Sequence, residues 1–199
     1  MIPPTLIFAT HNPHKVREMR TILGENLPII SLEEAGFFED IPEPHLTLEE
    51  NAREKSKTIY RKTGKNCFSE DSGLEVNGLH GAPGVHSSRY AGENKSSREN
   101  INKLLHQMQN LKNRQARFRT VISLVQEGKE FTFEGICRGS ISPNPRGEEG
   151  FGYDPVFIPE GSSLTFGEMS LEEKNLFSHR AKALGKFLAF FQTHYLPPN

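Results

Sequence analysis

Residues 5–15 read TLIFATHNPHK, a short apolar run followed by a polar turn. Thr5 to Ala9 has the length and the bounded apolar pattern of a strand. Pro13 suits the first turn of a helix, where its missing N–H costs nothing. Apolar residues then recur at helical spacing until Gly24, at Val16, Met19, Ile22 and Leu23. The stretch therefore predicts a strand, a loop and a helix in that order.

Capping signatures predict further helices along the chain. A serine or threonine three residues before a glutamate marks a helix start, because each side chain can accept a backbone N–H of the other residue. Three such pairs predict helices that begin after Thr47, Ser96 and Ser170, and the first of these helices should end at Gly64. A last amphipathic helix follows from the spacing of Ala181, Leu184, Phe187, Leu188 and Phe191.

Strand patterns are mixed with these helices and do not strictly alternate with them. Asn66 to Ser69 predicts a short strand that ends in a turn at Glu70-Asp71-Ser72-Gly73. Phe118 to Val125 and Glu130 to Arg138 flank Glu127-Gly128 and predict a long hairpin. At roughly 100 to 200 residues per domain, we expect one continuous domain over residues 1–199.

Composition excludes several classes of protein. Of the 199 residues 35% are hydrophobic, which is enough for a core, and 24 Lys and Arg against 25 Asp and Glu give a net charge of −1. Such a chain has no global positive field for nucleic acid, so any polyanion must meet a local basic cluster. No run approaches the roughly 18 apolar residues of a membrane span. Cys67 and Cys137 form no CxxC motif and no disulfide framework, so we expect a cytoplasmic protein. From the charge and the lack of an apolar span, we expect no nucleic-acid and no membrane partner.

The turn Thr10-His11-Asn12-Pro13-His14-Lys15 lies where the first strand ends and the first helix begins. Backbone N–H groups at a helix start, beside hydroxyl, amide and ammonium side chains, suit an oxyanion or a phosphate. The turn lacks the glycines of a P-loop or a Rossmann fingerprint, so neither motif is predicted. Taken alone, the segment is more often a plain polar turn with a helix cap.

Acidic side chains suggest a metal site. Glu43 lies in a proline-rich loop, and Glu70-Asp71 lies at the predicted end of a strand. Mg²⁺ prefers oxygen ligands, keeps several waters and bridges to substrate phosphates. A Glu-Asp pair by itself says little, because such residues more often face solvent or cap a helix.

A third candidate is the run Gly150-Phe151-Gly152-Tyr153-Asp154-Pro155, which is followed by Lys174 and by Ser178-His179-Arg180. Glycines let a backbone approach a ligand closely, an aromatic ring can stack on a base, and charged groups can contact the polar edges of that base. The alternative interpretation is a tight turn around one core aromatic residue.

Taken together, five segments resemble the inosine/xanthosine triphosphate pyrophosphatase family, and they occur in the family's order over nearly the whole chain. They are Thr10 to Lys15, Phe68 to Val76, Gly81 to Gly92, Gly150 to Pro155 and Lys174 to Arg180. The resemblance implies an α/β fold with an elongated central mixed sheet flanked by helices and two lobes around a cleft. It also implies a homodimer that uses Mg²⁺ to convert non-standard purine nucleoside triphosphates, such as ITP, dITP and XTP, to monophosphate plus pyrophosphate.

The same resemblance assigns roles to residues. Glu43 and Asp71 match metal ligands, and Asp71 matches the catalytic general base. The candidate substrate-binding residues on the phosphate side are Thr10, His11, Asn12, Pro13, His14, Lys15, Lys55 and Ser72. Those on the base and sugar side are Phe151, Gly152, Tyr153, Asp154, Lys174, His179 and Arg180.

Two positions depart from the family pattern. His11 stands where a glycine is usual, and Glu70 stands where the family commonly has aspartate. A side chain at position 11 changes how closely the backbone can approach phosphate, although an imidazole can also help to bind it. Two other functions are compatible with the residues: a related pyrophosphatase acting on other modified nucleotides, and a non-catalytic nucleotide sensor on the same scaffold.

Overall fold

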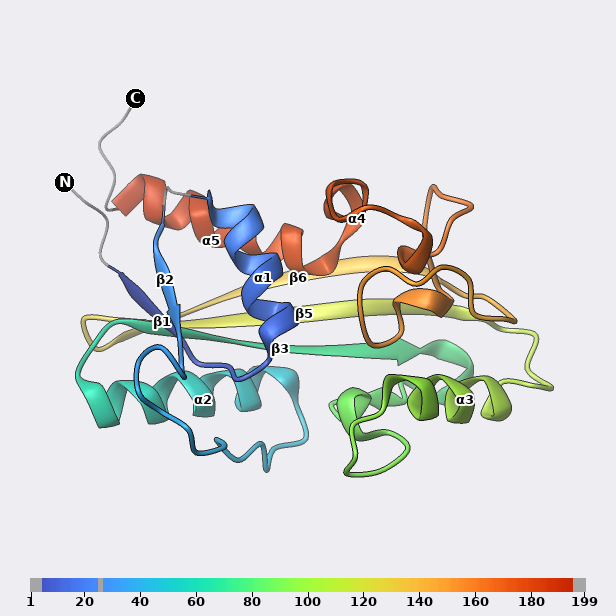
Figure 1. Ribbon diagram of the computed structural model, residues 1–199, viewed down its shortest axis with the longest axis horizontal. Helices are drawn as coiled ribbons and strands as arrows, with labels where there is room; N and C mark the ends of the chain where they lie inside the picture. The colour runs from blue at the N-terminus through green and yellow to red at the C-terminus, as the bar shows by residue number, and fades with distance from the viewer. Residues whose placement is uncertain (1–4, 25–26, 195–199) are drawn as a thin grey trace. The chain divides into compact units, whose positions relative to one another are not determined.

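The computed structural model describes residues 5–24 and 27–194 and has a mixed α/β fold (Figure 1). Over these residues the sheet has seven strands in the order β2-β1-β3-β5-β6-β7, with β4 paired to β3. β1 runs parallel to β2 and β3, whereas β4 and β7 run antiparallel to β3 and β6. The strands are β1 Leu6–Phe8, β2 Ile29–Ser31, β3 Cys67–Val76, β4 Pro83–Gly84, β5 Gln115–Gln126, β6 Lys129–Ile141 and β7 Phe157–Pro159. The expected α/β class with a central mixed sheet flanked by helices is confirmed.

Three helices begin where the capping signatures at Thr47, Ser96 and Ser170 predict, and α1 begins at Pro13 as its sequence predicts. Asn12, Thr47, Ser96 and Ser170 are N-caps whose side chains accept backbone N–H groups, and Gly64 ends its helix in a left-handed conformation. The α-helices are α1 Pro13–Leu23, α2 Leu48–Thr63, α3 Ser97–Gln107, α4 Leu171–Phe177 and α5 His179–His194. Short 3₁₀ helices are η2 Asn77–Leu79, η3 Ser87–Arg89, η4 Asp154–Val156 and η5 Phe166–Glu168. No helix in the described part of the chain is long and apolar enough to span a bilayer.

The chain forms two compact units, and each is built from separate stretches of sequence. Unit 1 contains the residues up to Asp71, Thr120–Glu134 and the residues from Lys182 on. Unit 2 contains Ser72–Arg119 and Gly135–Ala181. Each unit has its own hydrophobic core. The single domain expected for residues 1–199 stays a prediction.

The core of unit 1 lies on both faces of its strands. On one face, α1 and α5 pack against β1 and β3, where the Phe8 and Phe68 rings stack at 4.5 Å and Phe187 of α5 lies 5.1 Å from Phe68 (Figure 1). On the other face, Ile59 of α2 belongs to the same cluster as Ile7 of β1. The strands of unit 1 are therefore covered by helices on both sides.

β3 is longer than the sequence predicts, and this is a correction. The expected strand ends at Ser69, but β3 continues to Val76, so Glu70-Asp71-Ser72-Gly73 lies inside the strand and not in a turn. Acidic residues and glycine have low strand propensity, but pairing and burial override it. Neighbouring β1 and β5 enclose this strand, and residues 67–71 are all buried.

Side chains alternate along β3 as they must in any strand. Phe68 faces the α1 and α5 side. Toward α2, the Cys67 thiol donates a hydrogen bond to the Ser56 carbonyl at 3.1 Å, and the Ser69 hydroxyl donates to the Ala52 carbonyl. Within residues 67–71 of β3, odd-numbered residues therefore face α2 and even-numbered ones face α1.

The core of unit 2 joins α3 to strands and loops from the second half of the chain. Leu74 and Val76 of β3 and Ile101 and Leu104 of α3 belong to one buried cluster. In the same cluster the Phe118 ring lies 4.6 Å from the Phe157 ring. The predicted hairpin is confirmed as β5 and β6, which are joined by Glu127-Gly128 and are longer than expected.

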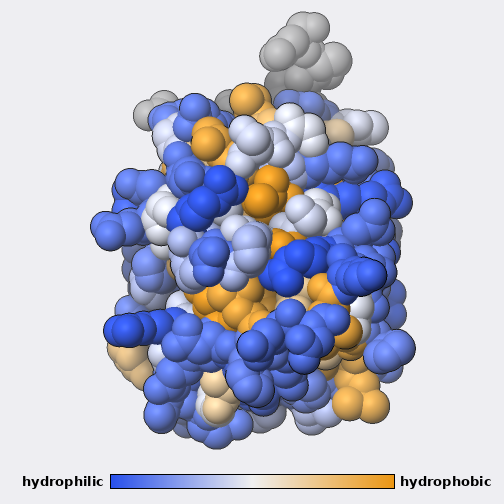
Figure 2. All heavy atoms as spheres, turned by 90° about the vertical axis from the view of Figure 1, so that its right-hand side faces the viewer, coloured by the Kyte–Doolittle hydropathy of each residue, from blue (hydrophilic) through white to orange (hydrophobic). Residues whose placement is uncertain are grey.

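Most apolar side chains lie in these cores. Figure 2 shows one face of the molecule as mostly hydrophilic, with apolar side chains gathered near its middle. Among residues 5–24 and 27–194, the exposed large apolar residues are Phe38, Leu46, Leu164 and Leu176. Two of them belong to each unit, so neither unit holds all of the exposed apolar surface.

Gly139 and Gly185 make a matched pair for testing the packing. A Cβ at Gly139 in β6 would lie 2.2 Å from the Ile158 carbonyl oxygen and 2.8 Å from the Phe157 ring, whereas a Cβ at Gly185 in α5 would meet nothing within 4 Å. We expect Gly139→Ala to lower the free energy of unfolding by about 1–3 kcal/mol through overpacking. Gly185→Ala should raise it by about 0.5–1 kcal/mol, because alanine favours a helix interior. Urea denaturation measures both, and equal effects would contradict the packing described here.

Candidate active site

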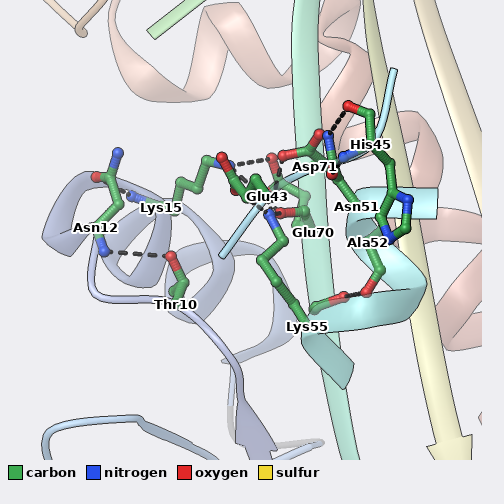
Figure 3. Close-up of polar contacts among 11 residues, drawn as sticks. Thr10, Asn12, Lys15, Glu43, His45, Asn51, Ala52, Lys55, Glu70 and Asp71 are labelled. Atoms are coloured by element: carbon green, nitrogen blue, oxygen red, sulfur yellow. Dashed lines mark hydrogen bonds and ion pairs between the residues drawn. The ribbon is translucent and has the colours of Figure 1, made fainter. Parts of the chain in front are cut away.

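Five charged side chains of unit 1 converge in what we call the lysine–carboxylate cluster, formed by Lys15, Glu43, Lys55, Glu70 and Asp71 (Figure 3). The first turn of α1 supplies Lys15, and the middle of α2 supplies Lys55. β3 supplies both Glu70 and Asp71, and the loop before α2 supplies Glu43. Four separate segments of the chain therefore meet at one place.

Lys55 is the centre of this cluster. Its ammonium group donates to Glu43 Oε1 at 2.7 Å, to Asp71 Oδ1 at 2.9 Å and to the Glu70 carbonyl oxygen at 2.9 Å. An ammonium group has three N–H donors, so these acceptors use them all. The Glu43 and Asp71 carboxylates, which are distant in sequence, thus face the same nitrogen.

Lys15 reaches the cluster from the opposite face of the strand. Its nitrogen lies 3.5 Å from both the carbonyl oxygen and a carboxylate oxygen of Glu70. Strand alternation explains the arrangement, because Glu70 points toward α1 while Asp71 points toward α2. The two lysines share the Glu70 carbonyl oxygen as an acceptor. That they provide the local positive charge expected for a polyanion stays a prediction.

The polar turn before α1 is built as a helix cap. Asn12 Oδ1 accepts the backbone N–H groups of His14 at 3.0 Å and Lys15 at 3.2 Å, and Thr10 Oγ1 accepts the N–H of Asn12 at 3.2 Å. Pro13 is the first helical residue, and both Pro13 and His14 are exposed. The cap therefore fixes the start of α1 and the direction in which Lys15 leaves it.

His11 contacts the loop that precedes α2. Its Nε2 donates to the backbone carbonyl of Glu39 at 3.0 Å, and Glu39 lies in the loop that carries Glu43. Thr10, His11 and Pro13 also line a cavity of about 530 Å³. Substrate binding by this turn stays a prediction.

Burial and charge shift the acidity of the cluster. Burial raises the pKa of Asp71 above its ordinary value, although the Lys55 and Lys15 charges act in the opposite direction. Burial disfavours the Lys55 ammonium, but attraction to Asp71 and Glu43 outweighs it and raises the pKa of Lys55. Lys55 therefore stays charged at neutral pH, and Asp71 is a stronger base than an ordinary aspartate.

The base-side candidates gather in unit 2 around the Phe151 ring. The Asp154 carboxylate accepts the backbone N–H of Phe151 at 2.8 Å and the Lys174 ammonium at 2.7 Å, and both charged groups are buried. The Lys174 nitrogen lies 5.3 Å from the centre of the Phe151 ring, and the Arg180 guanidinium lies 5.4 Å from it. Two cations thus hold one half-buried aromatic ring.

The neighbouring residues fix this segment in place. The buried Tyr153 hydroxyl donates to the Ser87 carbonyl at 2.9 Å, and burial, with a smaller effect of Tyr90, raises the pKa of Tyr153. A Cβ at Gly150 would lie 2.1 Å from the Asp154 carboxylate, so only glycine allows this approach. Tyr153 and Asp154 therefore shape the segment that presents Phe151.

The remaining predicted residues lie close to these groups in the chain. The His179 ring stacks on Phe118 at 4.6 Å, where α5 begins. Gly152 has a φ of 64°, in the left-handed region. Ser72 is half-buried in β3 directly after Asp71.

Sequence reasoning missed Asn51. This buried residue of α2 contacts the backbone of His45 through two hydrogen bonds, at 3.0 and 3.1 Å. A signal for it was present, because Asn51 lies one helical turn before Lys55 and so on the same face of α2. It did not stand out, because an asparagine near a helix start is usually solvated.

The sequence and the fold match a known family of proteins. The model of the Ham1 family matches residues 6–190, and the chain belongs to that family.

Named relatives are similar over most of their length. The dITP/XTP pyrophosphatase of Flavobacterium johnsoniae is 48% identical over 92% of this chain and 95% of its own. The dITP/XTP pyrophosphatase of Porphyromonas gingivalis is 49% identical over 93% of this chain and 96% of its own. The solved structure of the Staphylococcus aureus Ham1 protein is 37% identical, covers 95% of this chain and 98% of its own, and superposes with a TM-score of 0.86. The family resemblance found in the sequence is confirmed.

The raised pKa of Asp71 predicts how stability depends on pH in metal-free protein. The native state holds the Asp71 proton more tightly than the unfolded state, so ionising Asp71 lowers the free energy of unfolding as pH rises from about 3.9 to the raised native pKa. Asp71→Asn removes this loss. Because the variant also lacks the carboxylate that pairs with the buried Lys55 ammonium, it should be less stable than the parent at acidic pH. We expect that deficit to shrink across this interval and to stay smaller at neutral pH. Urea denaturation at several pH values in chelator measures it, and a pH-independent difference would contradict it.

Proposed function

We propose that this chain is a dITP/XTP pyrophosphatase, an enzyme that hydrolyses non-standard purine nucleoside triphosphates (ITP, dITP and XTP) to the monophosphate and pyrophosphate. The observation that carries the proposal is the lysine–carboxylate cluster, in which two lysines and three carboxylates converge beside the α1 start. Membership of the Ham1 family and relatives named dITP/XTP pyrophosphatase at 48% and 49% identity support it.

The cluster suits a divalent ion shared with the substrate. Among the described residues, no group of three or more His, Cys, Asp and Glu side chains could hold an ion by itself. The Glu43 and Asp71 carboxylates offer hard oxygens, and the Lys55 ammonium between them shows that they accommodate positive charge. These residues therefore fit Mg²⁺ that takes its other ligands from water and phosphate. When bound, the ion would neutralise phosphate charge and polarise the phosphorus that is attacked.

The residues of the cluster divide the chemistry among them. Lys15 and Lys55 attract the phosphates, together with the N-terminus of α1. Asp71, a stronger base than usual, accepts a proton from water as that water attacks the α-phosphorus. The bond between the α-phosphorus and the oxygen that bridges to the β-phosphorus breaks, and that oxygen leaves as part of pyrophosphate. No covalent intermediate with the enzyme is required.

Unit 2 supplies the groups suited to a purine. The Phe151 ring can stack on a base, and His179 and Arg180 carry N–H donors. Hypoxanthine and xanthine have an oxygen at the 6-position, where adenine has an amino donor. Two donors that face each other both stay unpaired, and a site built on hydrogen bonds rejects such a ligand strongly. ATP should therefore be a poor substrate.

The test of the reaction is a nucleotide panel with product analysis. Purified protein with Mg²⁺ should release pyrophosphate from ITP, dITP and XTP far faster than from ATP or from methylated pyrimidine triphosphates. Asp71→Asn, which preserves side-chain size, should lower turnover by about 10²–10⁴-fold and leave nucleotide binding largely intact.

Each contrary result has a distinct meaning. Preference for a modified pyrimidine triphosphate would favour the related pyrophosphatase, and binding without pyrophosphate release would favour the nucleotide sensor. Near-normal turnover by Asp71→Asn would remove Asp71 from its role. The homodimer and the cytoplasmic location stay predictions.

Selectivity has its own test at Arg180. Arg180→Ala should lower kcat/KM at least about 100-fold for ITP and XTP but within about 10-fold for ATP, because only the 6-oxygen bases lose a donor. Arg180→Lys keeps a cation near Phe151 and serves as the control. Circular dichroism checks the fold, since Arg180 is fully buried. Equal losses on all three nucleotides would argue against recognition of the base edge.

A further inference from the structure

Glu43 belongs to a segment, residues 39–45, whose backbone is held independently of its own carboxylate. Pro42 and Pro44 flank Glu43. Proline fixes its own φ, and it also restricts the residue before it to extended conformations. The backbone around Glu43 is therefore stiff, and the anchors at its two ends decide where the carboxylate lies.

The downstream anchor is Asn51. Its Oδ1 accepts the backbone N–H of His45 at 3.0 Å, and its Nδ2 donates to the backbone carbonyl of His45 at 3.1 Å (Figure 3). One side chain thus satisfies both backbone polar groups of His45. Asn51 is only 1% exposed, so water cannot readily replace these bonds.

Asn51 and Lys55 act on neighbouring parts of the same segment. They lie one turn apart on one face of α2. Asn51 holds the backbone of His45, and Lys55 holds the carboxylate of Glu43 two residues earlier. The α2 helix therefore holds the segment at two positions, the His45 backbone and the Glu43 carboxylate.

The upstream anchor is His11. Its Nε2 donates to the carbonyl of Glu39 at 3.0 Å, which joins the turn before α1 to the start of the segment. The Glu39 side chain, in contrast, makes an ion pair at 3.2 Å with Lys62, and both of these side chains are exposed. Such an exposed ion pair contributes little to holding residues 39–45 in place.

These anchors matter because all three N–H donors of Lys55 are already in use. Its three N–H donors are taken by Glu43, Asp71 and the Glu70 carbonyl, so binding a phosphate requires it to release at least one of them. We propose that Asn51, with His11, is a positioning residue that keeps the Glu43 carboxylate beside Asp71 when Lys55 turns to substrate. This inference rests on the proposed pyrophosphatase function.

The first measurement concerns the backbone and uses protein without metal or nucleotide. Asn51→Leu keeps the side-chain size and removes both hydrogen bonds, so hydrogen exchange at the His45 amide should rise at least about 10-fold. His11→Met should raise exchange in residues 39–43, whereas His11→Gln, which keeps a donor near the position of Nε2, should not. Lys62→Gln, which breaks only the exposed pair, should leave exchange in the segment unchanged.

The second measurement concerns the metal dependence of turnover. Loss of a group that orients a metal ligand typically costs 10–100-fold in metal affinity. We therefore expect Asn51→Leu and His11→Met to raise the half-saturating Mg²⁺ concentration about 10-fold or more, and Asn51→Leu to keep kcat at saturating Mg²⁺ within a few-fold of the parent. A merely structural role would lower stability or the active fraction and leave the half-saturating Mg²⁺ concentration unchanged.

Failure of the inference and failure of the proposed function give different results. Unchanged exchange in residues 39–45, or an unchanged half-saturating Mg²⁺ concentration in folded variants, would overturn the inference. If Asn51→Leu does not fold, the His11→Met and His11→Gln pair decides, because His11 is half-exposed. A parent protein without pyrophosphatase activity would refute the proposed function, and the exchange measurement would still decide whether the anchors hold the segment.

Discussion

The rest of unit 1 depends on the hydrogen bonds that the Lys55 ammonium group donates. Removing an ammonium from water costs several kcal/mol unless good partners replace the water. Here three oxygens replace it, from the loop before α2 and from two consecutive residues of β3. The same requirement draws Glu43 and Asp71 together, because each carboxylate is also partly or fully withdrawn from solvent. The arrangement that satisfies Lys55 in the free protein thereby brings together the groups that the chemistry needs.

Unit 2 uses the same principle for a different purpose. The Lys174 ammonium and the Asp154 carboxylate are each 4% exposed and lie 2.7 Å apart, and the backbone N–H of Phe151 completes the set. In unit 1 the buried pair lies at the proposed site of bond cleavage, whereas in unit 2 it orients an aromatic ring. A buried ion pair therefore organises the candidate residues of each unit.

Local features of the sequence predicted much of this structure. The helix starts at Asn12, Thr47, Ser96 and Ser170 follow from nearby residues, and the structure has them. The position of Glu70 and Asp71 inside β3 was missed, because strand pairing with distant segments decides it and local propensity does not. Asn51 was missed because its partner is the backbone of a loop, which no residue pattern specifies. The family resemblance supplied the remaining residue roles, and those roles stay predictions.

The environment of Cys67 has a consequence for how unit 1 can be observed. Burial raises the pKa of its thiol to about 12, although a backbone hydrogen bond acts in the opposite direction. The thiolate is the reactive form of cysteine, so alkylating reagents at neutral pH should find almost none of it while β3 stays packed on α2. The rate at which this thiol is labelled would therefore measure how often the packing between β3 and α2 opens. Cys67 is thus a built-in probe of local opening beside the lysine–carboxylate cluster.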